Sequence, residues 1–309
     1  MKKVTIATHD GIFHADEVFA LAVLKLFFEP EGKEMEIIRT RDLEKIALCD
    51  LAVDVGGEYS KAKNKFDHHQ KQKPASRKNG IPYASFGLIW KHFGKKITSS
   101  KKVWEAIERK LVTPIDALDN GVNLSTPIFK GINEYTNAHI ISAISSAYKE
   151  DQTSQAFIKA LEFAGLIVTG EIKKAEDKIE GEKIITEVIV KQGKPEVLVL
   201  EKYVTWEVSV SRCQNIKLVI FPDNDSSRWC IQAARDNLEV FGRDRISFPK
   251  GWRGLSNGDL ITASGISDSI FCHTGGFFAV AKSKSAAIEM AERVIAYQSE
   301  SGSLLNKKD

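Results

Sequence analysis

The sequence predicts an α/β fold in two domains, with a parallel sheet in the first domain and a smaller α+β second domain. Short β-branched and apolar runs alternate with helical patterns over the first part of the chain, which is typical of a parallel sheet. The chain has 309 residues, enough for two domains at ~100–200 residues each. Near residue 190 the pattern changes to closely spaced strand-like runs. We therefore expect domains at 1–190 and 191–309.

In the N-terminal domain, the β-branched run Val4–Thr8 stops at a His-Asp-Gly sequence and is followed by an apolar-periodic stretch, Asp16–Phe28. This order predicts a strand, a loop and a helix. Further strands are expected at Met35–Arg39 and Leu51–Val55, and further helices at Leu43–Ala47, Ser85–Phe93 and Lys101–Leu118. Parallel sheets gather their functional groups beyond the carboxyl ends of the strands, where His9 and Asp54 stand in this chain.

The second part of the chain begins with a long helical pattern, Ser154–Glu187. Its mixed charge favours a connector or a packed helix over a dimer zipper. Strands are expected at Val197–Leu200, Glu207–Val210, Lys217–Phe221, Trp229–Ala234 and Phe277–Ala281, and a closing helix at Ser285–Tyr297. The closely spaced strands of this segment predict the α+β arrangement of the second domain.

Composition excludes several classes of protein. Hydrophobic residues make up 43% and charged residues 28% of the chain, as in ordinary globular proteins. No apolar run approaches the ~20 residues that span a bilayer, so no membrane protein is expected. The four cysteines are scattered and form no C-x-x-C pair, which argues against a disulfide scaffold and a structural zinc site. The N-terminus has no signal-peptide pattern, and we expect a cytoplasmic protein.

Histidines and aspartates concentrate in the N-terminal domain. A lone histidine is usually an ordinary core or surface residue, but two His/Asp clusters at predicted strand ends favour a metal centre. The candidate residues are His9, Asp10, His14 and Asp16 in the first cluster, Asp67, His68 and His69 in the second, Asp54 between them, and Asp116 and Asp119 beyond them.

The ligand types narrow the choice of metal. Imidazole and carboxylate without thiolate suit Mn, Fe, Co or Zn, and oxygen-rich octahedral sites favour Mn or Mg. The candidate ligands outnumber what one ion needs, whereas two ions ~3.5–4 Å apart, bridged by a shared carboxylate, would use them. Such a pair generates hydroxide at neutral pH and stabilises both the attacking and the leaving oxygen of a phosphoryl group.

Four segments carry a resemblance to a known family. THDGIFHADEV, VDVGGEYS, KFDHHQ and IDALDNG together resemble the melanocyte proliferating gene 1 (MYG) family, over essentially the whole chain. The DHH sequence, with the His/Asp-rich first motif and a solitary aspartate before it, is similar to the DHH phosphoesterase superfamily of RecJ-type exonucleases, oligoribonucleases and manganese pyrophosphatases. The resemblance implies a DHH-type N-terminal domain, a C-terminal substrate-binding domain, and a metal-dependent hydrolase that acts as a 3′→5′ RNA exonuclease.

The resemblance also implies roles for the clustered residues. One ion would be bound by His9, His14 and Asp54, and the other by Asp16, Asp54, His68 and either Asp116 or Asp119. We favour Asp119, which lies next to the Asn120-Gly121 turn at the end of the predicted helix. In this scheme Asp54 bridges the ions.

Three further residues would act beside the metals. His69 would contact the phosphate or donate a proton, and Asp67 would orient the neighbouring imidazoles. Asp10 is either a ligand or an orienting group. Two manganese ions are expected, with Mg, Co or Zn as alternatives.

The C-terminal domain offers candidate substrate contacts. In FCHTGGFF, His273, Gly275 and Gly276 match by resemblance a Gly-Gly motif that binds substrate phosphate; the alternative is a structural turn. Arginines interleaved with tryptophans suit a nucleic-acid strand, the alternative being a solvated loop over a core tryptophan. The arginines singled out are Arg228, Arg235 and Arg245. The basic loop Lys71–Lys78 beside DHH is either ordinary surface or a substrate-steering element.

We therefore expect a metal-dependent nuclease for RNA or short oligonucleotides. A small-phosphate hydrolase is the first alternative: either a pyrophosphatase, whose substrate has no base to stack on the Arg/Trp segment, or a nucleotide or cyclic-dinucleotide phosphatase. A catalytically inactive, metal-stabilised binding protein is the second. The oligomeric state, a homodimer included, stays open.

Overall fold

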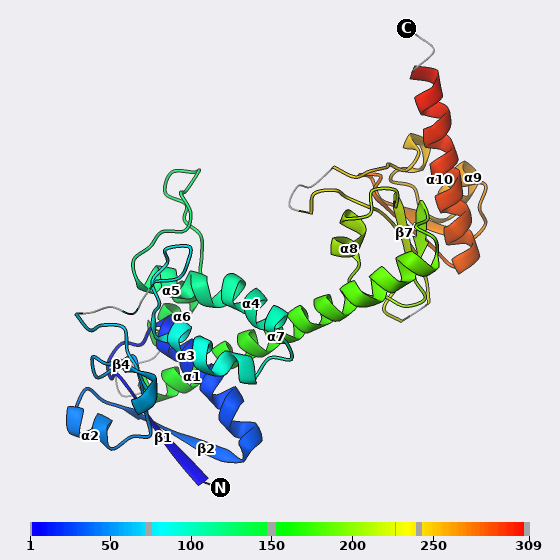
Figure 1. The fold of residues 1–309 in the computed structure, drawn as a ribbon. Coiled ribbons are helices and arrows are strands. Elements are labelled where there is room, and N and C mark those ends of the chain that lie inside the picture. Colours follow the sequence, from blue (N-terminus) through cyan, green and yellow to red (C-terminus); the bar gives the residue numbers. More distant parts are fainter. Residues whose placement is uncertain are drawn as a thin grey trace. The chain divides into compact units, whose positions relative to one another are not determined.

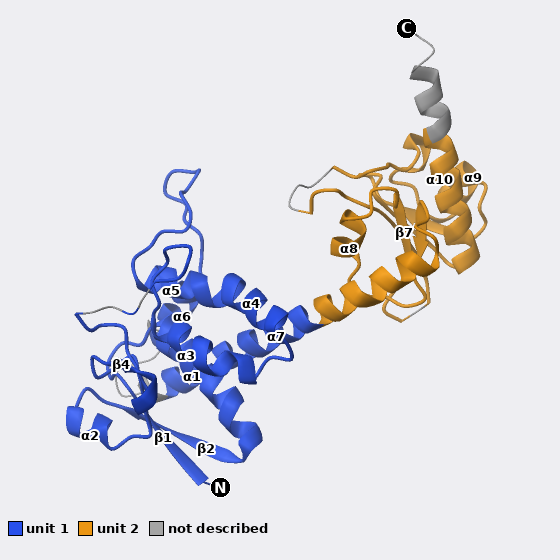
Figure 2. Ribbon diagram, in the orientation of Figure 1, with its two compact units in different colours: residues 1–176 blue, residues 177–309 orange. Residues whose placement is uncertain are grey.

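The structure is a computed structural model that describes residues 2–71, 74, 76–146, 153–225, 227–238 and 243–305 (Figure 1). The chain forms two compact units, residues 1–176 and residues 177–309 (Figure 2). They divide between Glu176 and Asp177, inside the long helix α7 (Thr153–Lys191). The domain boundary predicted near residue 190 falls at the carboxyl end of the same helix.

Unit 1 contains a five-stranded, mainly parallel sheet in the order β2-β1-β3-β5-β4. Its strands are β1 (Lys2–Thr8), β2 (Lys33–Arg39), β3 (Leu51–Val53), β4 (Tyr59–Ser60) and β5 (Lys65–Phe66). Strands β2, β1, β3 and β5 are parallel to one another, and β4 is antiparallel to β5. The predicted α/β class with a parallel N-terminal sheet is confirmed.

Unit 1 also contains several helical segments. They are α1 (Ala15–Phe28), α2 (Leu43–Ala47), α3 (Ser85–Phe93), α4 (Lys101–Ile107), a π-helical turn (Glu108–Val112), α5 (Thr113–Asp119) and α6 (Asn137–Ser146). Helix α1 connects β1 to β2 and packs against the sheet and against α3, α5 and α6. Because it is enclosed on nearly every side, α1 is apolar around most of its circumference. Helix α2 instead places Ile46 in a separate apolar cluster with Ala7 and Ala52.

Unit 2 contains a second sheet, in the order β6-β7-β8-β10-β9. Its strands are β6 (Val197–Val199), β7 (Leu218–Pro222), β8 (Trp229–Ala233), β9 (Ser269–Cys272) and β10 (Phe278–Ala281). Only the β6–β7 pair is parallel. The helices of this unit are the end of α7, α8 (Glu207–Ser211), α9 (Asn257–Ser264) and α10 (Lys284–Leu305).

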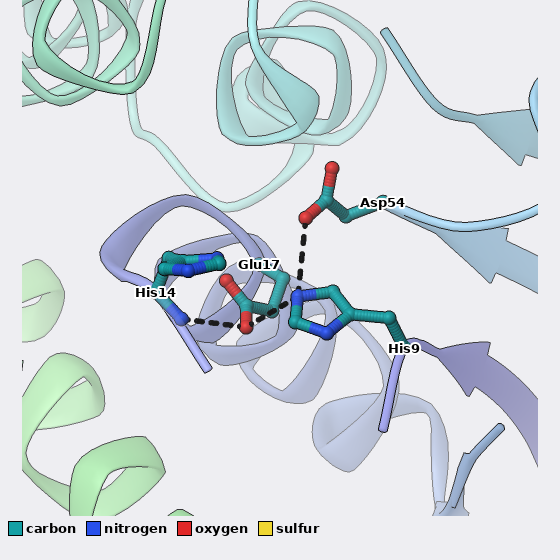
Figure 3. Close-up of side chains that lie close together, drawn as sticks. All are labelled: His9, His14, Glu17 and Asp54. Carbon is teal, nitrogen blue, oxygen red and sulfur yellow. Dashed lines mark hydrogen bonds and ion pairs between the residues drawn. The ribbon is translucent and has the colours of Figure 1, made fainter. Parts of the chain in front are cut away.

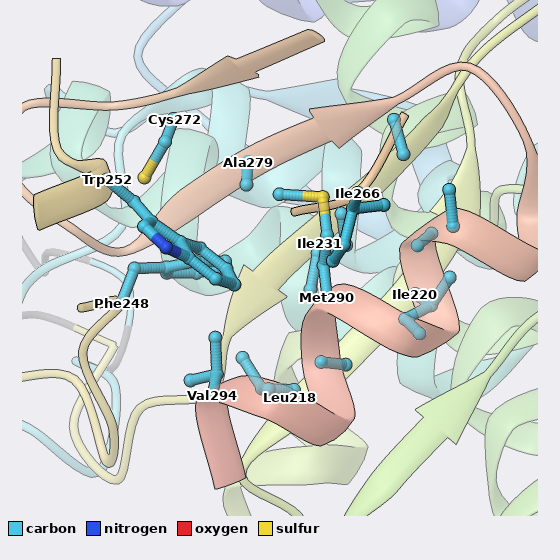
Figure 4. Close-up of a cluster of buried hydrophobic side chains, with 14 of the residues drawn as sticks. Leu218, Ile220, Ile231, Phe248, Trp252, Ile266, Cys272, Ala279, Met290 and Val294 are labelled. Atoms are coloured by element: carbon cyan, nitrogen blue, oxygen red, sulfur yellow. The ribbon is translucent and has the colours of Figure 1, made fainter. Parts of the chain in front are cut away.

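Alternate residues of β7 enter two different cores. Leu218 and Ile220 pack with Ile231, Phe248 and Met290 in the core that includes α10 (Figure 4). Val219 and Phe221 enter the core that includes the end of α7 and α8. This period of two is what a strand buried on both faces requires.

The structure corrects one element of unit 2. Glu207–Val210 alternates like a strand in sequence but begins helix α8, so the strand prediction is wrong. Ser209 and Val210 are buried, and Ser209 Oγ donates a hydrogen bond to the carbonyl of Glu182 in α7 at 3.3 Å. Packing against α7 thus outweighs the weak local preference of this segment for a β-strand. Strands β4, β5 and β9 and helices α6 and α9 were not predicted. Within the described residues, no helix has the length and apolar composition needed to cross a membrane.

Two matched substitutions test the unit 2 core. Val219→Ala should lower the free energy of unfolding by about 2 kcal/mol, because the Val219 side chain is fully buried in β7. Val190→Ala makes the same chemical change on α7 at a side chain that is 68% exposed, and should have little effect. The hydrogen–deuterium exchange rates of β7 and β8 peptides report how far each variant destabilises this core. Equal exchange rates in the two variants would contradict this description of the core.

Candidate metal centre

The sheet order brings the predicted functional groups together. Strands β1, β3 and β5 are adjacent and parallel, so their carboxyl ends lie at one edge of the sheet. His9 follows β1, Asp54 follows β3, and Asp67 to His69 follow β5. A parallel sheet collects side chains at this edge from segments that are distant in sequence.

A first group of ligand atoms belongs to His9, His14, Glu17 and Asp54, and these atoms lie within 4.8 Å of one another (Figure 3). His9 Nε2 is 3.0 Å from Glu17 Oε1 and 3.4 Å from Asp54 Oδ2. The other ring nitrogen, Nδ1, lies 3.0 Å from the carbonyl oxygen of Asp10. A proton on Nδ1 would donate to that carbonyl and leave Nε2 free to bind a metal.

Two more groups of ligand atoms are linked to the first in series, the second through Asp54 and the third through His68. One contains Asp54, His68 and His69, and the other contains Asp16, His68 and Asp119. His68 Nε2 lies 3.1 Å from Asp119 Oδ2 and 3.5 Å from Asp54 Oδ1. The two oxygens of Asp54 therefore face different imidazoles, Oδ2 facing His9 and Oδ1 facing His68.

Asp54 is held in an unusual backbone conformation. Its φ is +56°, in the left-handed region that side chains other than glycine rarely adopt. Such a conformation costs about 1–3 kcal/mol and persists only when its surroundings fix it. One such contact is the buried hydroxyl of Ser85, which donates to Asp54 Oδ1 at 3.0 Å.

The first turn of α1 supplies two buried carboxylates. Asp16 accepts a hydrogen bond from the backbone N–H of Ser85 at 3.3 Å, and Glu17 accepts one from the backbone N–H of His14 at 2.7 Å. The positive end of the helix dipole stabilises negative charge at this position. No hydrogen-bond donor satisfies the buried atoms Asp16 Oδ1 and Glu17 Oε2 within the described structure. Bare buried carboxylate oxygens of this kind fit a bound cation.

Asp67 organises the segment that follows β5. Its carboxylate accepts hydrogen bonds from the backbone N–H of Gly57 at 2.6 Å and of His69 at 3.0 Å. It also lies 2.9 Å from Nδ1 of the His69 ring. The ring of His69 is thereby fixed, while its side chain is 63% exposed.

A cavity of about 720 Å³ lies at this site, and its lining includes His9, His14, Asp16, Asp54, Asp67, His69 and Asp119 together with Arg41, Gly56 and Leu118. Among the described lining residues, Arg41 is the only lysine or arginine. Its Nε lies 3.2 Å from Asp10 Oδ1, and the Asp10 carboxylate is 55% exposed. The structure thus keeps the Asp10 side chain out of the three ligand groups, and Asp10 meets His9 through its main-chain carbonyl instead.

Arg39 fixes the loop between β1 and α1. Its guanidinium donates to the carbonyl oxygens of His9 and Gly11, at 3.3 Å and 2.5 Å. It also lies over the ring of Phe157, 4.7 Å from the centroid. These contacts set the path of the backbone that carries His9.

The neighbouring carboxylates raise the pKa values of two buried histidines. Burial lowers the pKa of His9, but hydrogen bonds with Asp54 and Glu17 outweigh burial and raise the pKa to about 10. Burial likewise lowers the pKa of His68, and its contacts with Asp119 and Asp54 raise it to about 10. The pKa of Asp16 is raised well above its usual value by burial and then by the negative charge of Asp54. The site therefore has an excess of negative charge that a cation would neutralise.

The structure distinguishes the two aspartates of α5. The fully buried Asp116 carboxylate lies 2.8 Å from Nη2 of Arg77 and accepts from the backbone N–H of Gly87 at 2.9 Å. Burial raises the pKa of Asp116 to about 7, against the opposing effect of Arg77. Asp116 belongs to none of the ligand groups of the described residues, whereas Asp119 does. The geometry favours Asp119 as the ligand.

In unit 2, the structure uses the predicted arginines within the fold. The Arg245 side chain is 6% exposed, and its guanidinium donates to the carbonyls of Val210, Ser211, Cys213 and Ile216. These bonds take up its donors, so the expectation that Arg245 contacts substrate is corrected. Arg235 is 17% exposed and lies 3.5 Å from Asp244. Arg228 is 55% exposed and pairs with Asp223 at 2.8 Å.

The Gly-Gly segment forms the turn between β9 and β10. Gly276 donates its N–H to the carbonyl of His273 at 2.9 Å and has φ +68°, a conformation that favours glycine. The backbone N–H of Gly275 donates to His273 Nδ1 at 3.0 Å. These bonds account for the segment as a structural turn. Three residues of the basic loop Lys71–Lys78, at positions 72, 73 and 75, lie outside the described residues.

Sequence reasoning missed Glu17, Ser85, Arg39 and Arg41. Glu17 carried a readable signal, because it stands three residues after His14 at the start of a helix. That spacing places an acidic side chain beside the residue before the helix, as in a capping box. Ser85 and the arginines reach the site from other elements, and no local motif marks them.

With this geometry established, the chain was compared with known proteins. Residues 5–295 match the MYG1 exonuclease family, described as Uncharacterised protein family (UPF0160). The chain belongs to the MYG1 exonuclease family. Its relatives include the MYG1 protein of Dictyostelium discoideum, 31% identical over 96% of this chain and 97% of that protein. The human MYG1 exonuclease is 30% identical over 95% of this chain and 86% of that protein. The expected family and the expected class of enzyme, a metal-dependent hydrolase, are confirmed.

A comparison with solved structures finds RecJ in complex with Mn²⁺ from Thermus thermophilus. It is 12% identical, covers 97% of this chain and 52% of that chain, and has a TM-score of 0.28. A likeness at this score carries no argument about the fold or the activity of MYG1 proteins.

The two aspartates of α5 can be separated experimentally. Asp119→Asn should weaken Mn²⁺ binding at least about tenfold, because it removes a charged ligand atom. Asp116→Asn should instead lower the free energy of unfolding by about 1–3 kcal/mol, because buried Arg77 loses a charged acceptor. Calorimetric metal titration and urea unfolding of both variants provide the measurement. The assignment to Asp119 would be refuted by weakened metal binding in Asp116→Asn alone.

Proposed function

We propose that this protein is a metal-dependent phosphodiesterase that degrades RNA or short oligonucleotides from the 3′ end with two divalent ions. The observation that carries this proposal is the placement of Asp54, whose two oxygens face His9 on one side and His68 on the other. A carboxylate in this position suits a bridge between two ions ~3.5–4 Å apart.

The proposed ligands follow from the grouping of the side chains. One ion would be held by His9, His14, Glu17 and Asp54. The other would be held by Asp16, His68 and Asp119, which form one group, and by Asp54, whose Oδ1 lies 3.5 Å from His68 Nε2. Imidazole and carboxylate ligands support manganese, with Mg, Co or Zn as alternatives. When bound, the ions supply an activated hydroxide and neutralise the charge of the reacting phosphate.

His69 is proposed to handle the proton of the leaving group. The hydrogen bond that the His69 ring donates to the Asp67 carboxylate raises the pKa of His69 and, with the neighbouring backbone contact, fixes the ring. Its exposed side chain borders the cavity, where the imidazolium can donate a proton to the departing oxygen. Asp67 acts through His69 by holding its orientation.

The lining of the cavity favours a phosphodiester over pyrophosphate as substrate. Pyrophosphate has a high density of negative charge, and beyond the metal ions the described lining offers it only one lysine or arginine, Arg41. The human relative is named as an exonuclease, which supports this activity. The assignment of residues 191–309 as a substrate-binding domain stays a prediction.

One assay tests the activity directly. Metal-free protein should be inactive, and added Mn²⁺ should restore shortening of a labelled RNA. RNA and DNA strands labelled at the 5′ end would give a ladder of successively shorter products if nucleotides leave from the 3′ end. Pyrophosphate and dinucleotides complete the substrate set. Release of phosphate from pyrophosphate alone would replace this proposal with the small-phosphate hydrolase.

The bridging role has its own test. Asp54→Asn should reduce RNA cleavage at least about 100-fold and weaken metal binding, because it removes the negative charge that the two proposed sets of metal ligands share. Asp10→Asn is the matched control, since the half-exposed Asp10 carboxylate contacts Arg41 and belongs to no ligand group among the described residues. Activity assays and calorimetric Mn²⁺ titration are run on both. Near-normal stoichiometry and affinity in Asp54→Asn would rule out the bridge.

A further inference from the structure

A second cavity adjoins the candidate metal centre. It has a volume of about 600 Å³ and is lined by residues of α5, α6 and the loop that joins them. Ile115 and Leu118 of α5 line both this cavity and the metal cavity. In α6, Ala138 lines the metal cavity, while its neighbours Asn137 and His139 line the second one. The two cavities therefore share walls built from the same two helices.

The second cavity has a fixed aromatic surface. The rings of Tyr135 and His139 stack with centroids 5.3 Å apart and planes inclined by 23°. The backbone N–H of Thr136 donates to His139 Nδ1 at 3.0 Å, which fixes the imidazole that supports Tyr135. Tyr135 is nevertheless 70% exposed. Burial in a core does not explain this stack, which presents an aromatic surface to the solvent beside the cavity.

The polar lining suits an uncharged ligand. Asn123, Asn133 and Asn137 contribute amides, which can both donate and accept hydrogen bonds. Lys110 is the only lysine or arginine of the described lining, and it already pairs with Glu171 at 2.6 Å. A phosphate would find little compensating charge here. A flat heteroaromatic group with hydrogen-bonding edges fits both the amides and the ring.

We propose that this cavity is a nucleobase subsite, in which the base of the nucleotide next to the scissile phosphate stacks on Tyr135. The inference rests on the proposed function, because it takes the phosphate of the same substrate to lie at the adjoining metal centre. The base is the part of the substrate that the metal centre does not recognise. Since every base has an aromatic face, stacking on Tyr135 accepts any base and suits an enzyme that degrades a strand processively or stepwise.

The test measures binding and requires no bond cleavage. Calorimetry with Mn²⁺ present compares adenosine 5′-monophosphate with ribose 5-phosphate, which lacks the base. The wild-type protein should bind the nucleotide about tenfold more tightly, the effect expected for one stacked base. Tyr135→Ala should abolish this difference, and Tyr135→Phe should retain it.

Phe129→Ala is the matched control. Phe129 lies in the same loop and is 69% exposed, but it does not line the cavity, so its loss should leave the tenfold preference intact. The inference is overturned if the wild-type protein binds both compounds equally, if it binds neither, or if Tyr135→Ala keeps the preference. A preference that depends on Tyr135 in a protein that cleaves no oligonucleotide would support the subsite and refute only the nuclease.

Discussion

The parallel alignment of β1, β3 and β5 is the constraint on which the rest of unit 1 depends. Each strand ends at the same edge of the sheet and delivers there a histidine or an aspartate. Carboxylates this close together would repel one another, but the imidazoles of His9 and His68 lie between them and offset their negative charge. The helices then enclose this edge: α1 adds its first turn, α3 adds Ser85 and α5 adds Asp119.

Much of this arrangement could be predicted from sequence because it follows from local rules. Strands β1, β2 and β3, the helix after His14 and the gathering of groups at strand ends are each encoded within a few neighbouring residues. The choice between Asp116 and Asp119 was not encoded in this way. Both stand on one face of a helix, and what separates them is Arg77, a residue of a distant loop that takes Asp116 as its partner.

In unit 2, the sequence pattern did not reveal what the arginines do. A run of arginines with tryptophans is compatible with nucleic acid and equally with a fold that needs donors for its own carbonyls. Arg245 serves the second purpose, since the backbone around α8 leaves four carbonyl oxygens that this single guanidinium satisfies. Composition does not distinguish these roles, because the partners of Arg245 are main-chain atoms from a separate segment of the chain.

The left-handed backbone at Asp54 limits which amino acids can occupy the centre of the site. Asparagine and aspartate tolerate this conformation better than residues with longer or branched side chains. Glutamate carries the same charge but would meet a conformational penalty before its carboxylate reached either imidazole. Asparagine keeps the shape and the backbone preference while losing the charge. Evolution at this position is therefore restricted by the polypeptide itself as well as by metal chemistry, and an inactive relative would most easily arise there through the single step from acid to amide.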